Sequence, residues 1–109
     1  MKNTPFKSIA LTAGGGTSQL NLNDKTEKYV FTGSATLLAN WVIEADLSDP
    51  AVQPIAGLSV EFVNNSRTIV GANTVNLLGV DITAYILVSF TAHCFYDGSA
   101  WTVQVFLTD

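Results

Sequence analysis

The amino-acid sequence predicts a small all-β protein, either an antiparallel β-sandwich or a jelly roll of about seven or eight short strands. Residues that favour strands, chiefly Thr, Val, Ile, Leu and Phe, dominate the chain, whereas Glu, Lys and Arg are scarce. Short runs of alternating apolar and polar residues are interrupted by Gly, Asn and Asp at short intervals. The length of 109 residues suits one hydrophobic core and is too short for two ordinary ones.

The clearest element is a hairpin near the C-terminus. Alternate residues are apolar in 88–96 and again in 101–107. The segment between them contains Asp97-Gly98, and a glycine at that place can adopt the positive φ that tight hairpin turns require. We therefore predict two antiparallel strands joined at residues 97–100.

The middle of the chain predicts several further strands. Residues 35–45 alternate, with Trp41 and Ile43 on the apolar side, and 46–57 form a loop because this segment holds two prolines and two aspartates. The other predicted strands lie at 58–62, 67–70, 75–78 and 82–90.

The first 28 residues are predicted to form an N-terminal arm or the first strands, ahead of a β-sandwich core at 29–109. Residues 6–12 and 19–23 have strand character, and Gly14-Gly15-Gly16 lies between them. Three consecutive glycines favour either a flexible arm or a tight crossing of the chain. We expect the core to fold without this arm.

The charge balance excludes several classes of partner. The net charge is −4, and four of the five basic residues lie within the first 28 positions. Residues 29–109 contain Arg67 as their single basic residue, so no basic patch is available for phosphates or for an anionic membrane surface. Charged residues make up 13% of the chain, against roughly 25% in ordinary domains. This shortage indicates that another chain covers part of the surface.

The single cysteine, Cys94, excludes an internal disulfide and any metal site built from several cysteines. We therefore expect folding in a reducing cytoplasm. The first residues lack an apolar run long enough for a secretory leader, and no stretch reaches the roughly 18 apolar residues of a membrane span.

No set of residues predicts catalysis. His93 and Cys94 are neighbours, and neighbours in a strand point to opposite faces, so they cannot act as a base and nucleophile pair. We expect Cys94 in the core and His93 facing outward or into an interface. Glu44 and Glu61 are the one pair of carboxylates on neighbouring predicted strands, and solvated strand faces explain both.

Weaker signals for ligands also have simpler explanations. Asp46 and Asp49 lack the spacing of a calcium loop. The segment 14–18 lacks the lysine and the helix that follow a phosphate-binding loop. Asn64 begins a glycosylation sequon, but no feature of the sequence predicts secretion. We expect no cofactor and no metal ion.

Aromatic residues offer one further possibility. Trp41, Tyr85 and Trp101 are candidates for a platform on which sugar rings stack. Aromatic residues on alternating strands more often fill the core, which we expect for most of them.

The sequence resembles small β-modules of tailed-phage virion proteins, found in head decorations, head fibres and tail fibres. The resemblance covers roughly residues 29–107. It rests on ANWVI at 39–43, GLSVEF at 57–62, LGV at 78–80 and YDGSAWTV at 96–103. It implies sandwich or jelly-roll subunits that form homotrimers, located in the virion and made in the host cytoplasm.

The function expected from this resemblance is structural: a capsid decoration or head-fibre subunit that self-assembles and binds the particle surface. A Met1 start and a short length favour a decoration protein over a domain of a long fibre. The basic N-terminal arm is the candidate for docking on the capsid or another virion protein. Its candidate contact residues are Lys2, Phe6, Lys7, Ile9 and Leu11.

Two other functions stay open at this point. One is a tail-fibre or receptor-binding module that binds host glycans through exposed aromatic residues. The other is a small enzyme, which the lack of a catalytic set disfavours. We expect neither nucleic acid nor membrane among the partners.

Overall fold

The computed structural model describes residues 6–11, 15–22, 28–33, 39–48, 50–66 and 73–108. These residues form nine strands in two sheets, together with a short α-helix, α1 (Thr83–Ile86), and a 3-10 turn, η1 (Pro50–Val52). Sheet A contains, in spatial order, β1 (Lys7–Ala10), β3 (Lys28–Thr32), β5 (Ser59–Asn64), β8 (Phe90–Tyr96) and β9 (Trp101–Leu107). Sheet B contains β2 (Gly16–Leu20), β4 (Trp41–Ala45), β6 (Val75–Leu77) and β7 (Val80–Asp81).

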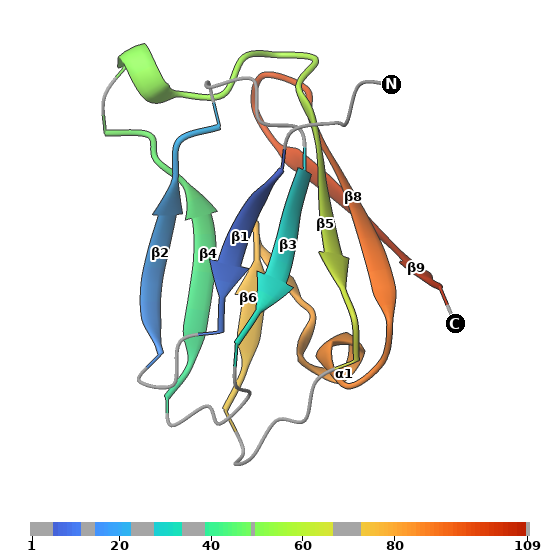
Figure 1. The fold of residues 1–109 in the computed structure, drawn as a ribbon. Coiled ribbons are helices and arrows are strands. Elements are labelled where there is room, and N and C mark those ends of the chain that lie inside the picture. The colour runs from blue at the N-terminus through green and yellow to red at the C-terminus, as the bar shows by residue number, and fades with distance from the viewer. Residues whose placement is uncertain are drawn as a thin grey trace.

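The first six strands alternate between the two sheets, as the ribbon in Figure 1 shows. Consecutive strands of one sheet are therefore separated in sequence by a strand of the other, and β1–β3, β3–β5, β2–β4 and β4–β6 pair in parallel. The last strands pair antiparallel, β5 with β8, β6 with β7 and β8 with β9. We call the segment from β1 to β6 the wound half and β8–β9 the C-terminal hairpin.

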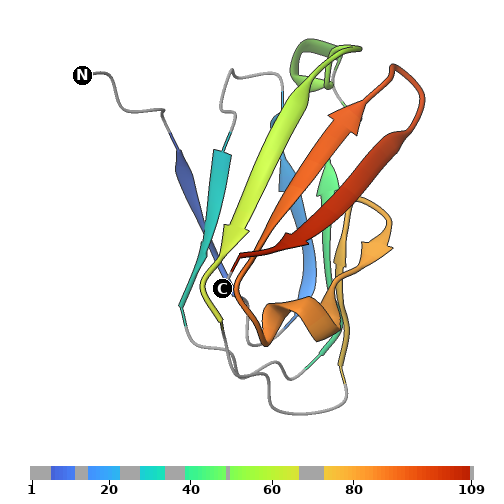
Figure 2. The same cartoon turned by 90° about the vertical axis from the view of Figure 1, so that its right-hand side faces the viewer.

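The predicted all-β class is confirmed, and the two sheets lie on either side of one core (Figure 2). The mixed order of parallel and antiparallel strands differs from the antiparallel sandwich or jelly roll that the sequence predicts. Alternation and turn residues identify strands, but they do not say which strands become neighbours, and this is where the prediction departs from the structure.

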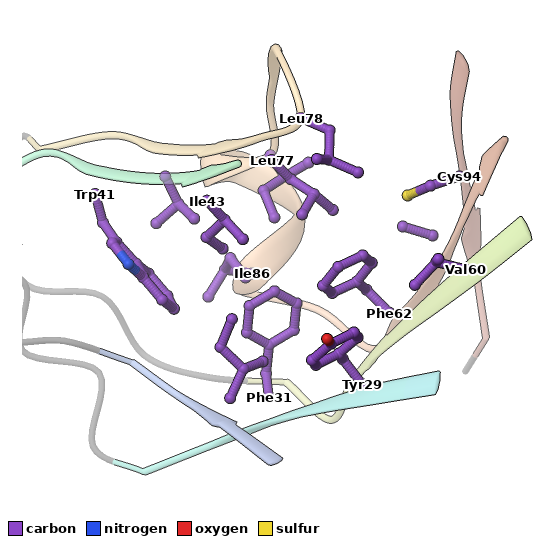
Figure 3. Close-up of a cluster of buried hydrophobic side chains, with 14 of the residues drawn as sticks. Tyr29, Phe31, Trp41, Ile43, Val60, Phe62, Leu77, Leu78, Ile86 and Cys94 are labelled. Atoms are coloured by element: carbon purple, nitrogen blue, oxygen red, sulfur yellow. The ribbon is translucent and has the colours of Figure 1, made fainter. Parts of the chain in front are cut away.

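The core is built from the inward faces of both sheets, as Figure 3 shows. Trp41 and Ile43 project from sheet B, and Phe31 and Phe62 project from sheet A, and all four are completely buried. The ring centroid of Phe31 lies 6.1 Å from that of Trp41 and 6.1 Å from that of Phe62. The indole of Trp41 donates a hydrogen bond to Ser18 Oγ at 2.8 Å, which satisfies its one polar atom.

The predicted strand at 82–90 is wrong except at its last residue, because α1 forms at 83–86 and β8 begins only at Phe90. The Asp81 carboxylate accepts hydrogen bonds from the backbone N–H and the hydroxyl of Thr83 and so turns the chain. The Thr83 hydroxyl in turn accepts a hydrogen bond from Val75 N at 2.8 Å. Ile82 and Ile86 then reach the core from a helical turn, so an apolar run of this length is explained by burial without a strand.

The N-terminal segment supplies the first strands of both sheets. Strand β1 pairs with β3, and β2 pairs with β4. Ile9 and Leu22 are 7% and 1% exposed, so they belong to the core of this same chain. Between the two alternatives that the sequence leaves for residues 1–28, the described residues favour first strands over a detached arm.

The glycines before β2 form a tight crossing. Gly15 has a φ of 72°, and a Cβ atom placed on it would lie 2.5 Å from the carbonyl oxygen of Asn40. Gly16 N donates to the same carbonyl at 2.8 Å. This close approach explains why position 15 is a glycine. Gly14 lies outside the described residues.

The C-terminal hairpin follows the prediction closely. Strands β8 and β9 pair from Phe90 with Leu107 to Tyr96 with Trp101. The predicted strands at 58–62 and 75–78 correspond to β5 and β6, and the alternating run 35–45 is a strand from residue 41 onward. The predicted strand at 67–70 lies outside the described residues.

Candidate functional site

The outer face of sheet A, meaning the side turned away from sheet B, presents a row of polar side chains. In β5 and β8 the residues at even positions point into the core, so Glu61 and His93 point outward. The pairing register places Lys28 beside Glu61, Glu61 beside His93, and His93 beside Gln104. These four residues, from four neighbouring strands, form what we call the polar row.

The polar row lies in an open depression of about 560 Å³ on this face. Ser59, Phe95 and Thr102, whose side chains point outward from the same strands, also line this depression. Lysine donates hydrogen bonds, glutamate accepts them, and glutamine does both. Because Lys28 and Glu61 have opposite charges, the depression suits a neutral polar ligand or a polar segment of a protein better than a strongly charged one.

Two aromatic rings border the polar row on the same face. Phe95 and Phe106 are 45% and 50% exposed, although both belong to paired strands. The ring of Phe106 packs edge-on against the imidazole of His93, with ring centroids 5.2 Å apart. This part of the surface therefore combines hydrogen-bonding groups with exposed aromatic area, which is the composition of many binding surfaces.

A turn fixes how β9 is placed beside β8. The Asp97 carboxylate accepts hydrogen bonds from Ser99 N at 2.7 Å and Ala100 N at 2.8 Å. The N–H groups of Ala100 and Ser99 hold the pKa of the Asp97 carboxyl below its usual value, because they stabilise the charged form. Gly98 has a φ of 106°, as predicted for this turn, and Trp101 packs on Tyr96 with ring centroids 4.9 Å apart.

His93 and Cys94 point to opposite sides of sheet A, which confirms their predicted placement. Cys94 is 2% exposed, and its burial raises the pKa of its thiol to about 12. A thiol held in this way is protonated at neutral pH and is a poor nucleophile. His93 is exposed on the outer face.

The predicted glycan-stacking residues do not form one platform. Trp41 is completely buried, so its ring faces are not accessible to a ligand. Tyr85 lies on α1 and packs against Phe90, at one end of β8, whereas Trp101 pairs with Tyr96 at the other end. Six residues of strand separate these ends, or roughly 20 Å. The rings exposed beside the depression belong to other residues, Phe95 and Phe106.

The predicted docking residues of the N-terminal segment are divided by the fold. Phe6 and Lys7 are exposed, Leu11 is half-buried against the core and Ile9 is buried within it. Lys2 lies outside the described residues. Two of the apolar residues for which the sequence predicts an external partner are thus covered by their own chain.

The other sequence candidates also lie apart. Glu44 is on the outer side of sheet B, where Gln19 Nε2 donates to it at 3.0 Å, and Glu61 is on the outer side of sheet A. Asp46 accepts hydrogen bonds from the side chain and the backbone of Ser48. Within the described ranges, no group of three or more His, Cys, Asp or Glu side chains is placed to share a metal ion.

Asn64, the asparagine of the sequon, is a core residue. It is completely buried, and its Nδ2 donates to the backbone carbonyls of Ile86 and Val88, each at 2.9 Å. The side chain thus binds the end of α1 to sheet A, and a glycan cannot be attached to it without unfolding this region.

Sequence reasoning missed the polar row. Alternation alone predicts that Glu61 and His93 point outward, but the parallel pairing of β3 with β5 is needed to bring Lys28 beside them.

Comparison of the chain with models of protein families, with curated proteins and with solved structures finds no match. Among the described residues, no helix is both long enough and apolar enough to cross a membrane.

Proposed function

We propose that the chain is a structural assembly subunit that binds copies of itself and a larger protein particle, and that it has no catalytic role. The observation that supports this most is the exposed apolar surface of the C-terminal hairpin and its neighbour α1. Large apolar side chains here are 40% to 62% exposed, although the chain has ample apolar residues for its core. They are Phe95 and Phe106 on the outer face of sheet A, Leu107 on the core side of β9, Tyr85 on α1 and Leu87 directly after it.

Exposed apolar side chains of this number, with few charges beside them, mark surfaces that other proteins cover. The region 98–108 contains no charged residue. The resemblance to phage virion modules supplies the setting: the particle is a virion, the docking partner is a capsid or other virion protein, and synthesis takes place in the host cytoplasm. A decoration or head-fibre subunit is the form of this function that we favour.

The test uses particles whose genome encodes this chain. We expect the chain as a stoichiometric component of purified particles, and we expect stripped particles to rebind the purified protein. Phe106→Ser is expected to weaken rebinding, because it removes apolar area from the exposed surface, whereas Thr17→Ser on the exposed side of sheet B is the matched control. Absence of the chain from purified particles overturns the proposal.

Glycan binding remains a second candidate, and the depression on sheet A supports it in a new place. Here the exposed ring of Phe95 lies beside hydrogen-bonding groups of the polar row. Titration calorimetry with the glycans of the host surface is the measurement. If this function is right, Phe95→Ala and Gln104→Ala abolish the heat of binding and Tyr85→Ala, an exposed aromatic control on α1, leaves it unchanged. Binding that Tyr85→Ala abolishes instead contradicts this placement.

A further inference from the structure

Strand β9 is an open sheet edge. It is the last strand of sheet A, and in the described part of the chain no strand pairs with its outer side. It is seven residues long and pairs with β8 at seven consecutive positions, so no bulge interrupts it. Proteins usually protect such edges with charged residues, prolines or bulges, and the β9 sequence WTVQVFL contains neither a charged residue nor a proline.

The other sheet edges are less suited to pairing with another chain. Strand β1 has four residues and begins with a charged residue, Lys7, and β7 has two residues. Strand β2 has five residues and begins at Gly16, directly after the tight crossing at Gly15. Among the described edge strands, β9 is the one that is long, free of bulges and uncharged.

The hydrogen bonds around β9 show which of its backbone groups are available. Asp97 N donates to Ala100 O at 3.1 Å, and Thr108 N donates to Ser89 O at 3.1 Å. Because bonded and non-bonded pairs alternate in an antiparallel ladder, the even-numbered residues of β9 bond to β8. The N–H and C=O groups of its odd-numbered residues point away from the sheet. These residues are Trp101, Val103, Val105 and Leu107.

We propose that β9 pairs antiparallel with β9 of a second copy of this chain, across a two-fold axis at Gln104. The inference deepens the proposed self-assembly by naming its interface, and to that extent it rests on the proposed function. In this register each odd-numbered residue faces an odd-numbered residue of the second copy. The four resulting pairs supply about eight backbone hydrogen bonds between the chains.

The side chains of β9 match one another in this register. On the core side of sheet A, Val103 lies opposite Val105 of the second copy, and Trp101 lies opposite Leu107. On the outer side, the amide of Gln104 meets the same amide across the axis, and two amides can each donate and accept. Leu107, which is 62% exposed in the single chain, gains an aromatic neighbour.

Charge favours a second copy as the occupant. The chain has a net charge of −4, so two copies carry like net charge and repel each other at long range. Residues 98–108 contain no Asp, Glu, Lys or Arg, and neither does β8, which pairs with β9. The β9 edge is therefore a place where two identical chains approach without opposing like charges.

The pairing has two consequences. An antiparallel pair of identical strands has a two-fold axis, so it predicts a dimer and departs from the trimer that the resemblance implies. It also places the two polar rows end to end, because Gln104 is the last residue of each row. The depression on sheet A then continues across the axis onto the second copy.

Disulfide cross-linking tests the register. At the axis, paired Cα atoms lie roughly 4.5 Å apart, within the range of a disulfide. Gln104→Cys is therefore expected to give a covalent dimer under mild oxidation. Thr102→Cys is the matched control on the same strand and face, since its copies lie four residues apart along the strand, or roughly 14 Å. Equal cross-linking of the two variants overturns the proposed register.

A charge swap tests the pairing without oxidation. Gln104→Lys and Gln104→Glu each place like charges across the axis, so each is expected to weaken dimerisation fivefold or more, and an equimolar mixture is expected to restore it. Sedimentation and native mass measurement report the species against the 11.6 kDa chain. A parent chain that stays monomeric at 100 micromolar (roughly the upper working range), or one whose assembly neither variant changes, overturns the inference. Rebinding to stripped particles is measured separately, so the docking function can hold where β9 pairing fails.

Discussion

The wound half and the C-terminal hairpin are built on different principles. In the wound half, strands far apart in sequence pair in parallel, and their side chains meet in a core of completely buried rings such as Phe31 and Trp41. In the hairpin, neighbouring strands pair antiparallel around Asp97-Gly98, and one face is left with exposed rings. The edge strands of the first region, β1 and β2, are short, whereas the second region presents exposed rings and a long, uncharged edge. We infer that the wound half provides most of the stability and the hairpin most of the binding.

The largest expected difference in stability between the two regions concerns the two tryptophans. Trp41→Ala removes a completely buried ring and is expected to lower the free energy of unfolding by about 3–5 kcal/mol. Trp101→Ala removes a half-buried ring from β9 and is expected to lower it by about 1–2 kcal/mol. Chemical denaturation followed by circular dichroism measures both.

The same pair of variants separates stability from assembly. Trp101 lies opposite Leu107 in the proposed pairing, so Trp101→Ala is expected to weaken dimerisation at a concentration where the chain is still folded. Equal losses of unfolding free energy for the two variants contradict the division between the two regions.

Glycine substitutions test the tight crossing of the chain in the wound half. Gly15 and Gly16 both have positive φ, so an alanine at either is expected to cost about 1–2 kcal/mol from backbone strain. A Cβ atom on Gly15 also lies 2.5 Å from Asn40 O, whereas one on Gly16 has no atom within 4 Å. Gly15→Ala is therefore expected to lower the denaturation midpoint clearly more than Gly16→Ala, and equal midpoints show that the crossing is not close.

Acid stability gives the smallest expected effect, and it tests the hairpin turn. Hydrogen bonds from Ala100 N and Ser99 N lower the pKa of Asp97 in the folded chain. Their stabilising contribution is present above the unfolded pKa of about 4 and is lost as the pH falls through the lower folded pKa. Asp97→Asn is expected to melt at a slightly lower temperature at pH 7 and to lose less on acidification. An unchanged slope of melting temperature against pH contradicts this role.

The sequence predicts the hairpin well because its signals are local. Alternating residues on both sides of Asp97-Gly98 determine the strands, their register and the outward position of His93. The parallel pairing of β3 with β5 joins residues about thirty positions apart, and no local pattern encodes it. The polar row depends on that pairing and therefore could not be predicted from the residues alone.

Alternation also leaves the two faces of a strand ambiguous. Trp41 has the same pattern whether its face turns to the core or to a ligand, and packing against Phe31 decides the matter. Asp81 and Thr83 show a second limit, because two side-chain hydrogen bonds turn an apolar run that alternation alone assigns to a strand. The sequence of this protein therefore predicts where its strands lie better than it predicts which strands pair.

Hydrogen exchange of the backbone amides of β9 shows whether this strand is an assembly edge. In the parent chain, at a concentration where it is dimeric, we expect the amides of Val103 and Val105 to exchange as slowly as those of Thr102 and Phe106. In monomeric Gln104→Lys, we expect Val103 and Val105 to lose this protection, because their N–H groups point away from β8, while Thr102 and Phe106 keep theirs. Rapid exchange of the Val103 and Val105 amides in the assembled parent chain contradicts the role of β9 as an assembly edge.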